Sequence, residues 1–473
     1  MKVVVVGSGI GGVSAAYHLL QDDHEVILCE KNAKIGGHAC TVSLDNEDVD
    51  LGFMMFGDSN PNIKAWFTKL GLTKKDGTTS IRIPMSMSVT SEVIGDVQFS
   101  SRHPFASVWD LFDTRVWQIL IDIYKFTVDL MTMPDKTNIT TREWAASNSY
   151  SHVFFRHYFL PFVAILWTIP KKDVLDLPAS QFLRCLKTHS NSLYIPLWQV
   201  IMGIFGRRAD RPKHLWWYIG AKYHTPFVQE MERKGGSILC NAQVVAVSKG
   251  GKSVTLASGE VITCDAVVLA GHGEESAKLI PWSPSVPKLL EYRFHNSTMY
   301  VHRDPSFLPE CKKAWSSWNV RITQDDEYIM TYWINRIQRL KTEKDVFVTI
   351  TPLDYTGRTP KKDTIIMEFP WDHPRLLADC LPQDDICDEP GIVLSGAWLG
   401  RGFHEDGYVA GRRAALMISQ PKHRKTPLYE DPENIPVPDV PPFGPPVSFT
   451  VMAALGVAAL GCAVYFTVNA VAH

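Results

Sequence analysis

Residues 2–12 of the chain read KVVVVGSGIGG, and this stretch decides the fold. The β-branched run over residues 2–6 is typical of a strand buried in a parallel sheet. The glycines that follow fit the pattern G-x-G-x-x-G, with Gly7, Gly9 and Gly12 at its three positions. The pattern alone is a weak signal, so its meaning depends on the residues around it.

The residues after the glycines complete a strand–turn–helix–strand unit. Residues 13–20 are apolar, as in a helix packed on a sheet, and residues 25–29 predict a second strand that ends at Glu30. In such a unit the glycines allow a tight turn and let backbone amides approach a pyrophosphate at the helix N-terminus. Glu30 stands where a carboxylate accepts hydrogen bonds from ribose hydroxyls, and its charge argues against a 2′-phosphate. We therefore expect a site for an NAD-like or FAD-like dinucleotide.

A glycine pair further along favours the longer of these two dinucleotides. Gly36 and Gly37, followed by His38, would let the chain run beside the adenosine–pyrophosphate part of an extended ligand. This arrangement resembles the glutathione-reductase-type FAD-binding fold, and within it the flavin amine oxidase and phytoene desaturase group. The resemblance implies FAD as the cofactor. It also implies an α/β fold in which an FAD-binding Rossmann domain is intertwined with an α+β substrate domain.

Length and charge narrow the class of protein. A chain of 473 residues exceeds the usual size of one core, so two domains are expected. The net charge is −2 with no basic block, which makes nucleic acid an unexpected partner. The nine cysteines form no CxxC pair, so neither a zinc site nor a disulfide framework is indicated.

Three runs in the middle of the chain are rich in apolar and aromatic residues: 154–167, 193–205 and 215–218. None is long enough to span a membrane. They are interpreted as core helices, as the wall of an apolar substrate cavity, or as an interfacial patch. Beside an apolar C-terminus, three such runs favour a long-chain lipid substrate.

The C-terminal residues 447–472 are 26 positions without a charged side chain, enough to cross a bilayer with some tilt. They predict a transmembrane helix that anchors the protein by its tail and leaves the catalytic body facing the cytosol. The alternative is a buried C-terminal helix. With this helix included, we expect the FAD-binding domain over 1–70, 223–285 and 386–420, the substrate domain over 71–222 and 286–385, a Pro-rich linker over 421–446, and the tail anchor over 447–472.

Short strings along the rest of the chain narrow the resemblance. They include His157-Tyr158-x-Leu160-Pro161, Ala164-x-x-Trp167, Phe182-Leu183, Ala314-Trp315-x-Ser317-Trp318-Asn319, Asn335-Arg336-x-Gln338, Phe347-Val348-Thr349 and the stretch from Gly396 to Gly407. Together they resemble a group of flavoproteins that are often encoded beside, or fused to, cyclopropane-fatty-acid synthases. Members of that group are associated with oxidation, desaturation or isomerisation of fatty acyl chains. This chain departs from the group at Gly220-Ala221, where a glycine pair is usual, and in its apolar C-terminus.

The resemblance implies a set of cofactor-binding residues: Gly7, Gly9, Ile10, Gly11, Gly12, Glu30, Lys31, Gly36, Gly37, His38, Val244, Gly396, Ala397, Phe403, His404 and Gly407. In that fold the N-terminus of the last helix, near Gly407, points at the flavin ring, where negative charge builds on reduction. Gly271-His272-Gly273 is not a second dinucleotide pattern, because Ser276 replaces the third glycine. No nicotinamide domain is therefore indicated.

Candidates for catalysis are His404 and Glu405 after the predicted flavin-facing loop, His157 in an aromatic run, and Trp398 as a neighbour of the flavin face. The alternative for each is a structural contact. Three hypotheses remain open: an FAD-dependent oxidoreductase or isomerase of long-chain acyl lipids, an amine oxidase that releases hydrogen peroxide, and a membrane-tethered flavoprotein without catalysis. Electrons would pass to oxygen or to a partner carrier, unless the reaction is a redox-neutral isomerisation.

Overall fold

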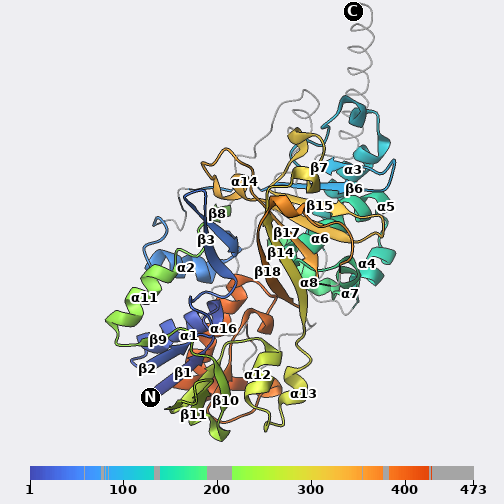
Figure 1. The fold of residues 1–473 in the computed structure, drawn as a ribbon. Helices are drawn as coiled ribbons and strands as arrows, with labels where there is room; N and C mark the ends of the chain where they lie inside the picture. Colours follow the sequence, from blue (N-terminus) through green and yellow to red (C-terminus); the bar gives the residue numbers. More distant parts are fainter. Residues whose placement is uncertain are drawn as a thin grey trace, which may run out of the picture. The chain divides into compact units, whose positions relative to one another are not determined.

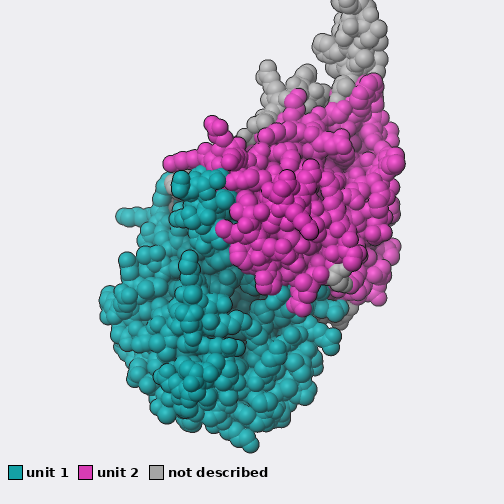
Figure 2. All heavy atoms as spheres, viewed as in Figure 1, with its two compact units in different colours: residues 1–82, 215–295, 372–437 teal, residues 83–214, 296–371, 438–473 magenta. Residues whose placement is uncertain are grey.

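The computed structural model describes residues 1–57, 59–75, 79, 81–83, 85–132, 139–188, 216–353, 355–375, 383–425 and 428 (Figure 1). The chain divides into two compact units (Figure 2). Unit 1 comprises residues 1–82, 215–295 and 372–437, and unit 2 comprises 83–214, 296–371 and 438–473. The chain thus crosses between units after residues 82, 214, 295, 371 and 437. The sequence pattern places the first four of these boundaries after residues 70, 222, 285 and 385.

Unit 1 is built on a five-stranded parallel sheet with the order β19-β13-β1-β2-β9. Its strands are β1 (Lys2–Val6), β2 (Glu25–Cys29), β9 (Ser237–Leu239), β13 (Ala266–Leu269) and β19 (Ile392–Leu394). The predicted strands at 2–6 and 25–29 are confirmed as β1 and β2. Segments far apart in sequence therefore share one sheet, and its strands β1, β13 and β19 are short apolar runs buried on both faces.

Helices pack on one face of this sheet, and a second, antiparallel sheet packs on the other. Val3 and Val5 of β1 pack in one core with α1 (Ile10–Gln21) and α16 (His404–Ser419). Val4 points to the other face and packs with a three-stranded antiparallel sheet of β10 (Val244–Val247), β11 (Ser253–Leu256) and β12 (Val261–Thr263). The alternation of side chains along β1 thus supplies both cores.

The remaining elements of unit 1 surround these layers. They are the hairpin β3 (Ala39–Leu44) and β4 (Glu47–Gly52), the pair β5 (Met55–Gly57) and β8 (Trp216–Tyr218), and the helices α2 (Pro61–Lys69), α11 (His224–Arg233), α12 (Gly273–Leu279), α13 (Val286–Leu289) and α15 (Gln383–Ile386).

Unit 2 contains a seven-stranded sheet with the order β18-β14-β17-β16-β15-β6-β7. Its strands are β6 (Met87–Ser91), β7 (Phe99–Ser100), β14 (Phe294–His302), β15 (Trp318–Ile322), β16 (Tyr328–Trp333), β17 (Phe347–Pro352) and β18 (Ile365–Pro374). Its helices are α3 (Thr114–Thr132), α4 (Thr141–Ser147), α5 (His152–Phe154), α6 (Leu160–Trp167), α7 (Lys171–Asp176), α8 (Ala179–Thr188) and α14 (Ile334–Gln338).

The aromatic run 154–167 forms α5, a π-helical turn (η2, Phe155–Phe159) and α6. Phe159 lies at the centre of a cluster of rings, with ring centroids 5.4 Å from Phe126, 5.1 Å from Trp144 and 5.1 Å from Phe182. All four side chains are buried. This run is therefore core, which is the first of the three interpretations considered for it. The run 193–205 lies outside the described residues, and residues 216–218 form β8 in unit 1.

The predicted fold class is wrong in one element. No helix in the part of the chain that the structure describes is both long enough and apolar enough to cross a membrane. The longest, α3, has 19 residues but carries charged side chains such as Arg115 and Asp122, and the apolar α6 has only eight. A span needs about 20 predominantly apolar residues. The α/β Rossmann-type fold holds, whereas the transmembrane helix added to it does not. Residues 447–472 themselves lie outside the described residues.

The ring cluster of unit 2 gives a first prediction. Because Phe159 is 1% exposed and touches three other rings, Phe159→Ala is expected to lower the free energy of unfolding by about 3–5 kcal/mol. Trp109 is 75% exposed, so the control Trp109→Ala should change it by no more than about 0.5 kcal/mol. Denaturant unfolding measures both. A cost at Phe159 as small as that at Trp109 would show that the run does not form a packed core.

Candidate functional site

The glycine turn joins the end of β1 to the start of α1. The amide of Gly7 donates to the carbonyl of Cys29 at 2.8 Å, and Gly7 has a φ of +99°, which favours glycine. A Cβ on Gly12 would lie 1.9 Å from the carbonyl oxygen of Gly7, so the third glycine is required for strand and helix to meet. A Cβ on Gly9, the N-cap of α1, would meet no atom within 4 Å. The N-terminus of α1 therefore faces open space, and its first amides have no partner within the helix.

Glu30 follows β2 and is 5% exposed. Its Oε2 accepts hydrogen bonds from the amide of Ser8 at 3.1 Å and from the hydroxyl of Ser8, and its Oε1 accepts from the amide of Asn32 at 2.8 Å. The hydroxyl of Ser8 also accepts from the amide of Gly36 at 3.1 Å. A carboxylate has about four lone-pair sites, so Glu30 keeps capacity for further donors such as ribose hydroxyls.

The glycine pair closes the turn from the opposite side. Gly36 and Gly37 have φ values of +128° and +56°. A Cβ on Gly37 would lie 3.1 Å from Cα of Gly9, and a Cβ on Gly36 would lie 2.3 Å from both the carbonyl oxygen of Ala39 and Cε1 of His224. Glycine is thus needed at both positions, for conformation and for space. The pair passes directly beside the open end of α1, as an extended dinucleotide requires.

The end of β19 supplies a third wall. A Cβ on Gly11 would lie 3.0 Å from the amide nitrogen of Gly396, and a Cβ on Gly407 would lie 2.5 Å from Cγ2 of Ile10 and 3.5 Å from the Cβ of Ala397. The structure therefore brings together predicted cofactor residues from both ends of unit 1. Helix α16 begins at His404, with Phe403 as its N-cap, so Gly407 lies inside its first turn and not at its start.

Three histidines gather next to the glycine pair. The ring of His38 lies 6.4 Å from that of His272 and 5.9 Å from that of His373, and His272 stacks on Phe294 at 3.7 Å. Burial lowers the pKa of His38, that of His272 to about 4 and that of His373 to about 3, so all three rings are neutral at pH 7. The sequence pattern does not single out His272 and His373. The signal for His272 is its place after β13, since the carboxyl ends of parallel strands meet at one edge.

His404 is held by two aromatic neighbours. Its ring stacks on Phe53 with centroids 3.6 Å apart, and its Nε2 is hydrogen-bonded to the hydroxyl of Tyr223 at 3.1 Å. Burial holds the pKa of His404 well below its ordinary value. A neutral imidazole with such a low pKa is a weak base, so these contacts favour a positioning role.

Glu405 caps α2. Its carboxylate accepts from the amide of Asn62 at 2.9 Å, from the side-chain amide of Asn62 at 2.7 Å and from the amide of Ile63 at 2.9 Å. Arg412 donates to the side-chain oxygen of Asn62 at 3.0 Å. Burial raises the pKa of Glu405 to about 7, against these hydrogen bonds. The carboxylate is engaged in joining α16 to α2, which is the structural alternative considered for it.

Three other predicted residues make packing or surface contacts. Trp398 donates from Nε1 to the carbonyl of Gly271 at 3.0 Å and belongs to the same hydrophobic core as Val244. Lys31 forms an ion pair with Glu275 at 2.8 Å, and both side chains are largely exposed.

His157 belongs to unit 2, whereas the other candidates belong to unit 1. Its Nε2 lies 2.7 Å from Oδ1 of Asp96, whose other oxygen accepts from Arg156 at 3.1 Å. The side chain is 2% exposed, and burial lowers its pKa to about 4. These contacts are those of a buried histidine that joins η2 to the segment before β7.

The two glycines of the turn give a second prediction. Gly9 has a φ of −61° and open space, so Gly9→Val is expected to leave the melting temperature of the FAD-free protein unchanged. The valine would occupy the space in front of α1 and weaken FAD binding at least tenfold, or about 1.4 kcal/mol. The comparison variant Gly12→Val should instead lower the melting temperature of the FAD-free protein. Calorimetry and flavin fluorescence measure the two effects, and undiminished FAD binding by Gly9→Val would contradict this assignment.

Glu405 gives a third prediction. Its pKa in the folded protein, about 7, lies above its ordinary value of 4.5, so the folded state binds the proton more tightly than the unfolded state. The stability that this group contributes is therefore greatest below pH 4.5 and falls as the pH rises to 7, by up to roughly 3 kcal/mol.

Glu405→Gln removes this titration but keeps a side chain of the same size. The unfolding free energy of the wild type minus that of the variant should therefore decrease from pH 5 to pH 8. The control is the exposed Glu260→Gln, which makes the same substitution outside α2 and α16. A difference that stays constant across this range would contradict the prediction.

Comparison with known proteins finds similarity of sequence over part of the chain. Residues 5–70 match a family described as an NAD(P)-binding Rossmann-like domain. The chain is similar to an L-amino acid oxidase of Cerastes cerastes, 38% identical over 73 residues, which are 15% of this chain and 14% of that protein. It is also similar to a protein of Mycobacterium tuberculosis (strain ATCC 25618 / H37Rv) named as a flavin-containing monoamine oxidase, 33% identical over 86 residues, 17% of this chain and 19% of that protein. The matched stretch thus spans less than a fifth of either relative.

The similarity of fold extends further than the similarity of sequence. The solved structure of cyclohexylamine oxidase from Brevibacterium oxydans matches with a TM-score of 0.54 at 15% identity, over 89% of this chain and 99% of that one. These findings confirm the resemblance to flavin amine oxidases that the sequence indicates. Residues 5–70 thus match an NAD(P)-binding Rossmann-like domain, and the chain as a whole has a fold similar to that of this solved amine oxidase structure.

Proposed function

We propose that this chain is an FAD-dependent oxidoreductase that oxidises, desaturates or isomerises a long-chain fatty acyl or related lipid substrate. The observation that carries the cofactor part of this proposal is the open space at Gly9, in front of the N-terminus of α1. The residues around it, Glu30, Gly37 and Gly396, are those that an extended dinucleotide needs. The substrate part rests on the resemblance to the flavoproteins that accompany cyclopropane-fatty-acid synthases.

The residues of unit 1 fit the cofactor in both charge and space. The amides and dipole of α1 would hold the pyrophosphate, and the carboxylate of Glu30 would accept hydrogen bonds from ribose hydroxyls. When bound, a flavin supplies a centre that accepts a hydride from a C–H bond. Neutral imidazoles at His38, His272 and His404 leave this region without fixed positive charge from histidine at pH 7. Such surroundings suit an uncharged reacting carbon.

A second candidate function is oxidation of an amine. It is supported by the names of similar proteins, among them the monoamine oxidase of M. tuberculosis and the cyclohexylamine oxidase of B. oxydans. The two candidates differ in the substrate that would reduce the flavin, so one experiment separates them.

The fourth prediction concerns that experiment. Protein loaded with FAD is kept anaerobic and mixed in turn with free fatty acids, phospholipids and amines. A lipid is expected to bleach the visible absorbance of the oxidised flavin, or to be isomerised without bleaching, and analysis of the lipid products distinguishes these outcomes. The control is Gly9→Val, which should fold but show neither effect. Bleaching by an amine, with no lipid changed, would replace the first proposal by the second.

A further inference from the structure

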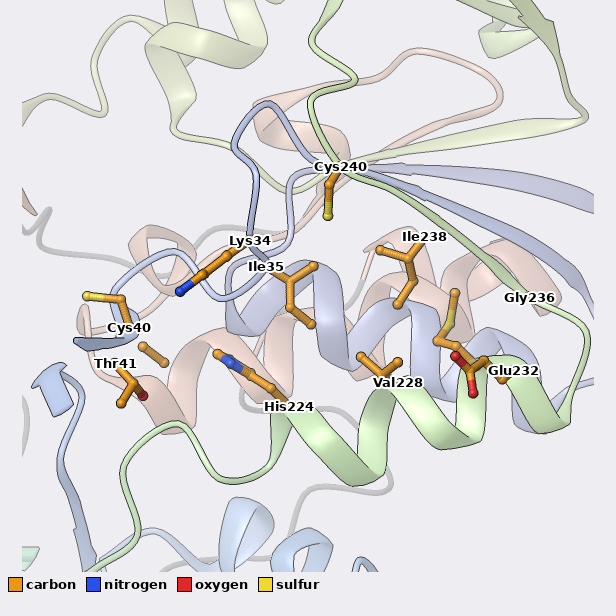
Figure 3. A pocket seen from close by; sticks show the side chains of 12 residues that line it. Lys34, Ile35, Cys40, Thr41, His224, Val228, Glu232, Gly236, Ile238 and Cys240 are labelled. Carbon is orange, nitrogen blue, oxygen red and sulfur yellow. The ribbon is translucent and has the colours of Figure 1, made fainter. Parts of the chain in front are cut away.

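Unit 1 contains a pocket of about 570 Å³ outside the cofactor site (Figure 3). Its walls come from the segment 34–41 after β2, from α11, and from β9 with the residue that follows it. None of the predicted cofactor residues lines it. Pockets that hold small molecules have volumes of about 300–1,000 Å³, so this one is of suitable size.

The two ends of the pocket differ in charge. Figure 3 shows the ammonium group of Lys34 directed toward the end where Cys40 and Thr41 lie, and Glu232 at the opposite end. The side chains of Ile35, Val228 and Ile238 lie between these ends. The pocket thus offers a cation and a hydroxyl at one end, an apolar middle and a carboxylate at the other end.

We propose that this pocket is a second ligand site, which binds an amphiphile with one carboxylate and an apolar chain. The carboxylate lies at the Lys34 end, because an ammonium group attracts it there and Glu232 repels it from the other end. The chain covers Ile35, Val228 and Ile238, which are partly exposed in the free protein, and removing such surface from water is favourable by about 25 cal/mol per Å².

The pocket touches the cofactor loop through His224. The ring of His224 lines the pocket and packs on Gly36, where a Cβ would lie 2.3 Å from Cε1. Gly36 in turn donates its amide to the carbonyl and to the hydroxyl of Ser8, both at 3.1 Å, and that hydroxyl donates to Glu30. A ligand that fixes the ring of His224 therefore also fixes Gly36, which is joined through Ser8 to the carboxylate of Glu30. Binding of the amphiphile and of FAD should then strengthen each other by the same factor.

The fifth prediction tests the site by calorimetric titration of the full chain with decanoate. Decanoate is expected to bind at this pocket both without FAD and with it. Binding here is distinguished from binding at a substrate site by its loss in variants of the residues that line the pocket, so the test does not depend on the proposed enzymatic function. Lys34→Met removes the charge but keeps an unbranched side chain of similar length, and it should weaken binding at least tenfold. Val228→Glu should weaken it as strongly, because it places a carboxylate in the apolar middle.

A control variant and a control ligand test whether binding depends on the charge of Lys34. Lys278→Met removes an exposed lysine of unit 1 that does not line the pocket and should leave decanoate binding unchanged. Decylamine has a similar chain with the opposite charge and should bind at least tenfold more weakly than decanoate. Equal or tighter binding of decylamine, or unchanged decanoate binding by Lys34→Met, would overturn the site. An affinity for decanoate that is the same with and without FAD would overturn the coupling through His224.

Discussion

The hydrogen bonds of the Glu30 carboxylate are the constraint on which the rest of unit 1 depends. They join Ser8, in the turn after β1, to the end of β2. The hydroxyl of Ser8 also accepts a hydrogen bond from the amide of Gly36. Burying a carboxylate is costly unless hydrogen-bond donors surround it. These donors are backbone amides and one hydroxyl, so the charge of Glu30 holds three segments in register. The open space at Gly9 exists because these segments are fixed around it.

Close packing of two helices supplies the second half of the site. Gly411 of α16 meets α1 so closely that a Cβ there would lie 2.2 Å from the carbonyl oxygen of Gly11. The hydroxyl of Ser14 also donates to the carbonyl of Tyr408 at 2.7 Å. Segments far apart in the sequence are thereby brought together, and Gly396 and Gly407 lie close to the N-terminus of α1.

Unit 2 bears on the substrate in a different way. The described aromatic run contributes Phe159 to a cluster of packed rings, so these contacts give no support to a lipid cavity there. The acyl-substrate proposal therefore rests on the resemblance to a family and not on this run. The pocket of unit 1 is independent evidence for an amphiphilic ligand, since its charge and its apolar middle are properties of its own side chains.

The sequence by itself determined the local elements and the glycine positions. The strands at 2–6 and 25–29 and the helix between them depend on neighbouring residues, and all three are confirmed. The grouping of Gly7, Gly9 and Glu30 was also predictable, because a strand–turn–helix–strand unit has a fixed geometry.

Only the tertiary structure decided what the long-range neighbours are. The position of Glu405 after a glycine-rich loop suggests a catalytic carboxylate. Its oxygens instead accept hydrogen bonds from amides of α2, which lies more than 300 residues away in sequence. His373 joins His38, and His224 packs on Gly36, through contacts that no sequence spacing encodes. The transmembrane helix was expected from composition alone, and no described helix has that character. Local pattern fixes an element, whereas the role of a side chain depends on the partners that packing brings to it.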